Sequence, residues 1–207
     1  EIEGNVIRNN YPPYTAEVII DAPNAFKGHE YVITVTVTNA TEGYVVLKVN
    51  EKEYKDLQIV NGTVSQVVDF AELVEGAINN VSAFYGGSEA VNPGEANATF
   101  IVLDGVITNS TFYNYFDENG YLLPTPNGVT LDFQGLFLGK YPVYIDKSVN
   151  VVSSTGDALF DCGASYAGNA INSFNIVAGG DNTNITGLDF INYCLYIKGA
   201  SNVTVDD

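Results

Sequence analysis

The chain has 207 residues, enough for one large domain or two small ones, and 46% of them are hydrophobic, so a sizeable core can be buried. Its 25 acidic residues against 8 basic ones give a formal net charge of −17, which argues against binding to nucleic acid or to an anionic membrane surface. The chain has only one histidine (His29) and one arginine (Arg8), which argues against most hydrolase and phosphotransfer mechanisms. It has no run of about 18 apolar residues, which argues against a membrane span.

The first part of the chain is predicted to be a series of short strands. Residues 1–15 form a linker or an edge strand, because Asn9, Asn10, Pro12 and Pro13 interrupt regular structure. The stretch 31–38 alternates apolar and polar β-branched residues with a period of two, which is typical of a half-buried strand. Further strands are predicted at five places: 45–49, 57–60, 63–67, 81–85 and 99–103.

Asn61-Gly62 lies between two of these apolar runs. That dipeptide is the strongest short-range indication of a β-hairpin, because a type I′ turn needs a positive φ at both of its central residues. The spacing of the strands predicts that residues 16–104 form an immunoglobulin-like β-sandwich. The Cys…Trp…Cys pattern of antibody domains is missing, so the domain is not of the antibody type.

The composition changes after residue 104. A short amphipathic helix is expected around 109–116. Beyond residue 135 very short strands are predicted at 143–145, 149–151, 158–160, 174–176, 185–190, 195–197 and 203–205. Asn-Ile-Thr at 184–186 recurs as Asn-Val-Thr at 202–204, 18 residues on, with Gly, Asn and Asp between the strands. A short period of this kind is typical of a parallel β-solenoid, whose coils bury a core only by stacking. No segment resembling a cap follows residue 205, so residues 105–207 are expected to be an incomplete solenoid whose native polypeptide continues.

Few residues are candidates for a site. Cys162 and Cys194 would form a disulfide only if their coils stack, and otherwise are small buried apolar residues. Seven Asn-x-Ser/Thr motifs are candidate N-glycosylation sites. Their asparagines are Asn39, Asn61, Asn80, Asn97, Asn109, Asn184 and Asn202.

No catalytic or metal site is predicted. Asp181, Asn182 and Asn184 follow two glycines and could ligate Ca²⁺ through oxygen, but their spacing fits no regular calcium loop and favours a turn. His29, after Gly28, is expected in a solvated turn. Asp206 and Asp207 are adjacent, and in a strand they would point to opposite faces, which does not suit paired-carboxylate hydrolysis.

Two stretches resemble known surface proteins. The segments 45–49, 60–64 and 81–87 are similar to bacterial-type immunoglobulin-like repeats of large surface adhesins. The segment Ile107–Leu122 resembles the start of the pectate-lyase-like β-helix in adhesin-like proteins of methanogenic archaea, and 144–151 and 184–190 resemble its coils. The resemblance implies an all-β chain, with an Ig-like sandwich followed by the N-terminal cap and first coils of a right-handed parallel β-helix.

The function that this resemblance implies is a non-catalytic adhesin or structural protein, extracellular and on the cell surface, without cofactors. Its partner would be a cell-surface or envelope component, a glycan or another cell. Two alternatives stay open: a carbohydrate-binding or polysaccharide-degrading β-helix protein, and a subunit that self-associates through the open end of the β-helix.

Overall fold

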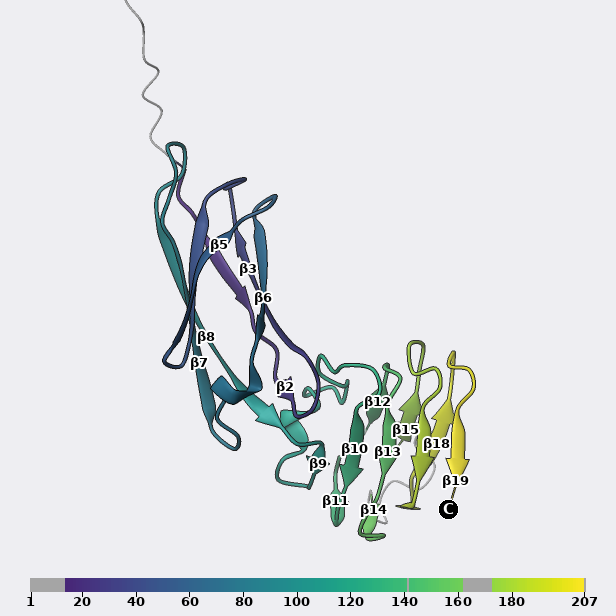
Figure 1. Cartoon of the computed structure of the whole chain (residues 1–207). Coiled ribbons are helices and arrows are strands. Elements are labelled where there is room, and N and C mark those ends of the chain that lie inside the picture. The colour runs from purple at the N-terminus through teal and green to yellow at the C-terminus, as the bar shows by residue number, and fades with distance from the viewer. Residues whose placement is uncertain (1–13, 141, 162–172, 207) are drawn as a thin grey trace, which may run out of the picture. The chain divides into compact units, whose positions relative to one another are not determined.

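The computed structural model describes residues 14–140, 142–161 and 173–206. The chain is nearly all β, with 51% strand and 3% helix, which confirms the predicted all-β class. Its contacts divide it into two compact units (Figure 1). One contains the chain up to Pro23 and Glu30–Ile101, and the other contains Asn24–His29 and the chain from Val102 onward. The segment Asn24–His29 thus groups with residues far along the chain, which the sequence-based division at 104 does not anticipate.

The first unit is built on two sheets. One sheet is antiparallel, in the order β1-β3-β6. The other has the order β2-β8-β7-β4-β5 and is antiparallel except for the pair of β2 with the end of β8, which is parallel. The residues of this parallel pair belong to the second unit. The strands are β1 (Val18–Asp21), β2 (Ala25–Phe26), β3 (Tyr31–Val37), β4 (Tyr44–Val49), β5 (Lys52–Gln58), β6 (Thr63–Val68), β7 (Ile78–Tyr85) and β8 (Gly94–Leu103). A 3₁₀ turn, η1 (Phe70–Glu72), precedes β7.

The core of this unit comes from alternate residues of the strands of both sheets. In β3, Tyr31, Ile33, Val35 and Val37 are each at most 4% exposed, while the residues between them are half-buried. This is the period of two that the sequence predicts for 31–38, and it arises because successive side chains of a strand point to opposite faces. Buried residues on β4 and β7, such as Leu47 and Tyr85, repeat the pattern in the other sheet.

The predicted hairpin at Asn61-Gly62 is wrong, although its turn forms. Asn61 and Gly62 have φ of 53° and 83°, as a type I′ turn requires, and Val60 and Thr63 are bridged across it. Beyond the bridge the strands diverge, because β5 pairs with β4 whereas β6 pairs with β3. The turn therefore carries the chain from one sheet to the other instead of joining two neighbouring strands.

The second unit contains three sheets of parallel strands. The first sheet has the order β19-β16-β13-β10-β9, the second β11-β14-β17 and the third β12-β15-β18. The strands are β9 (Val106–Ile107), β10 (Thr130–Phe133), β11 (Leu136–Leu138), β12 (Val143–Ile145), β13 (Asn150–Val152), β14 (Ala158–Asp161), β15 (Ser173–Ile176), β16 (Asn184–Thr186), β17 (Leu188–Ile191), β18 (Cys194–Ile197) and β19 (Thr204–Asp206). From β10 on, the described chain visits the first, second and third sheets in turn and repeats this cycle until β19 (Figure 1). One passage of the chain through the three sheets is called a coil below.

The core of the second unit is a set of stacked apolar side chains. In the first sheet Leu131 pairs with Val151 and Val151 with Ile185, and all three are at most 2% exposed. Burial ends at the last described strands, because the next partner in this row, Val205, is 51% exposed. Ile197 in the third sheet is likewise 49% exposed, although its partner Ile176 is fully buried.

Phenylalanines fill the space between these aliphatic rows. Phe137 and Phe160 pair in register, and their rings stack with centroids 4.6 Å apart. Phe133 and Phe174 meet Phe160 at centroid distances of 5.4 and 5.5 Å. All four side chains are at most 1% exposed, so they form one aromatic cluster at the centre of the stack.

Three local expectations in this unit need correction. The helix expected around 109–116 is only a 3₁₀ turn, η2 (Phe112–Asn114), whose Phe112 is buried. The strand predicted at 185–190 is not one strand, because Gly187, with φ of 70°, lies between the end of β16 and the start of β17, which belongs to another sheet. The 18-residue repeat is also not the structural one, since Asn184 pairs with Thr204, 20 positions later.

Candidate functional site

All seven candidate glycosylation asparagines are exposed in the structure. Asn39, Asn61 and Asn109 lie in turns, and no hydrogen bond of the Asn61 or Asn109 side chain is found among the described residues. Two others bond to the neighbouring coil: the side-chain amide of Asn184 donates to Asn150 at 3.1 Å, and that of Asn202 donates to Asn182 at 2.8 Å.

The remaining two glycosylation motifs lie side by side on paired strands. In the β7–β8 register Asn80 is opposite Thr99 and Asn97 is opposite Ser82. Each acceptor asparagine therefore faces the hydroxyl residue of the other motif. Both motifs are held in regular antiparallel sheet, so their backbones are fixed by ladder hydrogen bonds.

The described structure contains one of the two candidate disulfide cysteines, Cys194. Cys194 is an exposed free thiol at the start of β18, on the outward face of the third sheet, where it pairs with Ser173. Cys162 lies outside the described residues, as does Asp207, the partner of Asp206 in the acidic pair.

The segment that could ligate Ca²⁺ instead forms a corner between coils. Asp181 accepts two hydrogen bonds from Ser201, one from its backbone N–H at 2.7 Å and one from its hydroxyl at 2.6 Å. These bonds hold the pKa of the Asp181 carboxyl below its ordinary value. Asn182 has a φ of 60° and accepts from Asn202, so the polar residues of this turn serve coil–coil contact.

Within residues 14–140, 142–161 and 173–206, no three His, Cys, Asp or Glu side chains are grouped so that they could hold a metal ion. None of the helical segments in this part of the chain has the length and hydropathy of a membrane-spanning helix.

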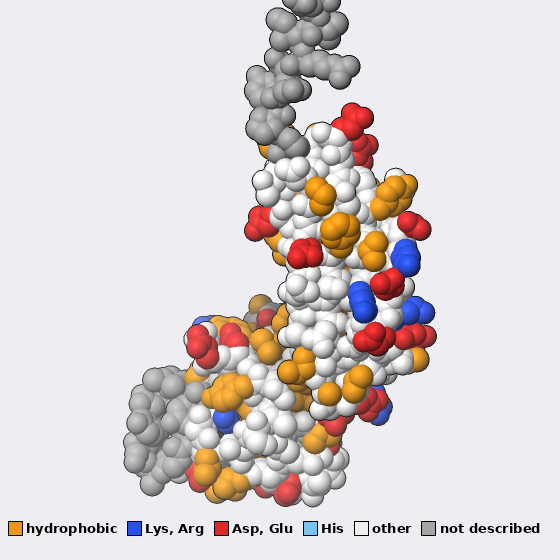
Figure 2. Space-filling model, turned by 90° about the vertical axis from the view of Figure 1, so that its left-hand side faces the viewer, with side chains coloured by type: hydrophobic (Ala, Val, Ile, Leu, Met, Phe, Trp, Pro, Cys, Tyr) orange, Lys and Arg blue, Asp and Glu red, His pale blue; other side chains and the backbone are white. Residues whose placement is uncertain are grey.

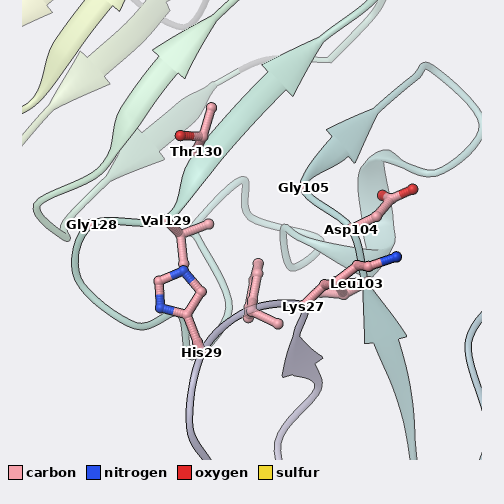
Figure 3. A pocket seen from close by; sticks show the side chains of 9 residues that line it. Lys27, His29, Leu103, Asp104, Gly105, Gly128, Val129 and Thr130 are labelled. Atoms are coloured by element: carbon pink, nitrogen blue, oxygen red, sulfur yellow. The ribbon is translucent and has the colours of Figure 1, made fainter. Parts of the chain in front are cut away.

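A polar pocket that sequence analysis did not anticipate lies among the described residues of the second unit. Its volume is about 200 Å³, and three separate stretches of the chain line it (Figure 3). The lining residues are Phe26, Lys27, His29, Leu103, Asp104, Gly105, Gly128, Val129 and Thr130, all of which belong to the second unit.

Backbone contacts bring these stretches together. Phe26 pairs with Leu103 in the parallel β2–β8 ladder, and the N–H of Lys27 donates to the carbonyl of Leu103 at 2.9 Å. Gly105, with φ of 88°, lies so close to the backbone of Thr130 that a Cβ there would overlap the Thr130 carbonyl oxygen. Only glycine allows this approach, which places the residues before β9 against the start of β10.

Two hydrogen bonds orient the Asp104 carboxylate. One of its oxygens accepts from the backbone N–H of Val106 at 2.9 Å and from the phenol of Tyr115 at 3.3 Å. Burial raises the pKa of the Tyr115 phenol, and the charge of Asp104 raises it further, so this phenol stays protonated as a donor. The other carboxylate oxygen forms no hydrogen bond with the described residues.

Other polar groups of the pocket lie around an apolar base. His29 and Thr130 are partly or largely exposed, and their side chains form no hydrogen bond or ion pair with the described residues. Phe26, Leu103 and Val129 are buried, at 3% or 4% exposure, and supply the base. Figure 3 shows the imidazole of His29 beside Val129 on one side and Lys27 and Asp104 on the other. The pocket thus combines an imidazole, a hydroxyl, an ammonium and a carboxylate.

Of the pocket residues, only His29 attracts attention in the sequence, where it is predicted in a solvated turn. It does follow a turn, since its N–H donates to the Phe26 carbonyl at 3.1 Å and Gly28 has a φ of 81°. Lys27, Asp104 and Thr130 belong to no motif, and their proximity follows only from the β2–β8 pairing and the parallel register of β9 and β10.

Comparison of the chain with protein-family models, with curated proteins and with solved structures gives no match in any of the three.

Proposed function

We propose that this chain is a non-catalytic surface protein, in which an Ig-like module acts as a spacer and the first coils of a right-handed parallel β-helix act as a stalk or binding shaft. The observation that carries the proposal is the order of the strands in the second unit, where the chain passes repeatedly through three parallel sheets. A chain that coils in this way buries its apolar residues only against neighbouring coils, as a solenoid does.

The assignment of an Ig-like module rests on the two sheets of the first unit. Their strands are antiparallel, apart from the parallel β2–β8 pair, and their buried faces supply the core of the unit. Neighbouring strands in sequence often belong to different sheets, as β5 and β6 do, which is typical of sandwich folds. The resemblance of 45–49, 60–64 and 81–87 to adhesin repeats points to the same type of module.

A mechanical role agrees with how the second unit is held together. Its coils are joined by continuous rows of buried side chains and by polar bonds at the corners, such as those from Ser154 to Asp132 and from Ser201 to Asp181. Such a stack has few ways to bend without opening several contacts at once. Acidic side chains are scattered over the face in Figure 2, as suits a protein that stays soluble at high net charge.

The proposal is tested by the location of the protein on its source cells. Antibody raised against the 207-residue chain is applied to intact cells and to permeabilised cells. We expect intact cells to be labelled, and external protease to remove the label while a cytoplasmic marker is retained. Labelling that needs permeabilisation would overturn the proposal.

A further inference from the structure

The sequence contains three Asn-Gly pairs, which are Asn61-Gly62, Asn119-Gly120 and Asn127-Gly128. In such a pair the backbone nitrogen of the glycine can attack the asparagine side chain with little obstruction, because glycine has no side chain of its own. All three asparagines are exposed. Residue type and exposure therefore do not distinguish the pairs, and any difference in their reactivity must come from how the backbone is held.

Two of the three pairs have a glycine N–H that is already engaged. The N–H of Gly120 donates to the carbonyl of Asp117 at 3.1 Å, and that of Gly128 donates to the carbonyl of Ser148 at 2.7 Å. Gly120 is also packed so closely that a Cβ there would overlap the carbonyl oxygen of Pro142. A nitrogen that donates a hydrogen bond can attack the preceding side chain only after that bond opens, so the fold protects both pairs.

The peptide group that joins Asn61 to Gly62 is held differently. Neither its carbonyl oxygen nor its N–H forms a hydrogen bond with the described residues, and the two bonds of the turn run between Val60 and Thr63 instead. Gly62 is anchored through its own carbonyl, which accepts from the N–H of Val37 at 2.7 Å, but that carbonyl belongs to the next peptide group. The group between Asn61 and Gly62 can therefore rotate without breaking any of these bonds.

This rotation brings the reacting atoms together. It converts the type I′ turn to a type II′ turn, in which φ of Asn61 stays positive while ψ changes from about +30° to about −120°. A five-membered ring made of the Cγ, Cβ, Cα and carbonyl carbon of Asn61 and the nitrogen of Gly62 is nearly planar, and in an L-residue it needs a ψ near the second value. Gly62, with φ of 83°, reverses the sign of its φ in the same movement, which glycine does at little cost.

We infer that Asn61 is a site of spontaneous deamidation in the folded chain. The nitrogen of Gly62 loses its proton to solvent and attacks the side-chain carbonyl carbon of Asn61. The new C–N bond closes a succinimide ring, and the side-chain nitrogen takes up a proton and leaves as ammonia. Water then opens the ring at either carbonyl. Breaking the bond from the Gly62 nitrogen to the side-chain carbon gives aspartate, and breaking its bond to the main-chain carbon gives isoaspartate.

The modification acts at the turn that carries the chain from one sheet of the first unit to the other. Isoaspartate adds a carbon atom to the main chain between Val60 and Thr63, which the bridge between these two residues does not accommodate. Both products carry a carboxylate in place of the Asn61 amide, so the nitrogen that accepts a glycan is lost. Deamidation and glycosylation of Asn61 therefore exclude each other. The inference concerns the isolated chain and does not rest on its location at a cell surface.

The test compares the folded and the unfolded chain. The whole unglycosylated chain is incubated in mildly alkaline buffer, one sample native and the other unfolded in guanidinium chloride. Peptide mass spectrometry follows the conversion of amide to acid at each of the three asparagines. In guanidinium chloride we expect similar rates at all three, because each precedes a glycine. In the native chain we expect Asn61 to react about tenfold faster than Asn119 or Asn127, the factor that one retained hydrogen bond gives.

A matched pair of variants assigns the reaction. In Asn61→Gln the side chain is longer and closes a less favourable six-membered ring, so the native chain should no longer accumulate acidic forms on ion-exchange chromatography. Asn127→Gln is the control and should leave those forms unchanged, because the fold already protects Asn127. Labelling by a protein isoaspartyl methyltransferase should detect isoaspartate at position 61, which only opening of the ring produces.

Three results would overturn the inference. One is an equal native rate at the three asparagines. Another is protection of Asn61 by the fold as strong as that of Asn119 and Asn127, which would mean that the turn does not rotate. The third is formation of acid at position 61 without isoaspartate, which would mean hydrolysis without a ring. None of these results bears on cell-surface labelling, so the two proposals can fail separately.

Discussion

Ser154 donates two hydrogen bonds to the carboxylate of Asp132, which lies 22 residues earlier in the chain and one coil away. Its backbone N–H reaches one carboxylate oxygen at 2.8 Å and its hydroxyl reaches the other at 2.6 Å. Ser201 makes the same pair of donations to one oxygen of Asp181, 20 residues earlier. An aspartate that receives both donors of a serine in the next coil is therefore a recurring way to join coils in this unit.

Removing one hydroxyl should loosen the corner that it holds. We expect Ser154→Ala to cost about 1 kcal/mol, because the Asp132 carboxylate loses a hydrogen bond but keeps the one from the backbone. Hydrogen exchange measured by mass spectrometry should then be faster in peptides from 150–161. Ser82→Ala is the control, since the Ser82 hydroxyl forms no hydrogen bond with the described residues. An equal change in both variants would contradict the prediction.

Acid should destabilise the second unit through these carboxylates. Burial of Asp132 raises its pKa, but the hydrogen bonds from Ser154 and Gln134 together lower it more, so the pKa falls below its ordinary 3.8. The pKa of Asp181 is also lowered, by the hydroxyl and backbone donors of Ser201. A carboxyl whose pKa is lower in the folded state than in the unfolded state stabilises the fold. This stabilisation is fully present when the pH is above the pKa of the unfolded state, and it is lost as the pH falls through the pKa of the folded state. The loss therefore belongs below about pH 4.

The measurement is the urea midpoint of unfolding across this acid range. In Asp132→Asn/Asp181→Asn the side chains no longer titrate, so the midpoint should start lower at neutral pH and fall less steeply on acidification. A double variant with the same acid dependence as the unmodified chain would show that other carboxylates control it.

The aromatic cluster should be the most sensitive part of the second unit to truncation. Phe160 is fully buried and its ring contacts the rings of four other phenylalanines and of Tyr193. Phe160→Ala removes these contacts and leaves a cavity, at an expected cost of about 3–5 kcal/mol. Leu138→Ala, next to Phe137 but 56% exposed on the outward face, should cost less than about 1 kcal/mol. Calorimetric unfolding distinguishes the two, and similar losses would place Phe160 outside the core.

Gly120 should tolerate no side chain. It has a φ of 83°, and a Cβ there would overlap the backbone carbonyl oxygen of Pro142. Its own carbonyl accepts from the N–H of Tyr144 at 2.8 Å, so Gly120→Ala should break this pairing together with the Tyr121–Tyr144 ring stack. Gly156→Ala is the matched control, because Gly156 also has a positive φ but has open space around it.

The control should cost only the backbone strain of about 1–2 kcal/mol that a left-handed conformation imposes on alanine. Gly120→Ala should cost clearly more in thermal unfolding. Equal melting temperatures for the two variants would mean that the segment after Gly120 moves away from Tyr144 at little cost.

Glycan transfer to the folded chain should discriminate among the seven motifs. Asn61 is exposed at a turn, and its side-chain amide has no hydrogen bond with the described residues, whereas those of Asn184 and Asn202 are engaged with the next coil. We expect a purified oligosaccharyltransferase with a lipid-linked oligosaccharide to modify Asn61 before Asn184 or Asn202. Glycopeptide mass spectrometry gives the order, and Asn61→Gln identifies the peptide. Earlier modification of Asn184 would contradict the role assigned to its hydrogen bond.

Much of the local structure can be predicted from the residues themselves. The alternation at 31–38 predicts β3 with its buried face, and short apolar runs predict β12, β14, β15 and β18 within a residue or so. These elements follow from local steric preference and from the period of two, which do not depend on the rest of the chain. Strands β10 and β11 were not predicted, because they lie in a stretch where turn residues and aromatics obscure the alternation.

Pairing and proximity were decided by tertiary structure. The residues Asn61-Gly62 fix the backbone of a tight turn, but only the partners of β5 and β6 determine that the turn changes sheets. The recurrence of Asn-x-Thr suggests a period of 18, whereas stacking of Asn182 on Asn202 sets the register at 20. The pocket also depends on tertiary structure, because Lys27, Asp104 and Thr130 belong to no motif in the sequence. They share a site because β2 pairs with the end of β8 and because Gly105 lets two backbones approach, and neither contact is encoded by neighbours along the chain.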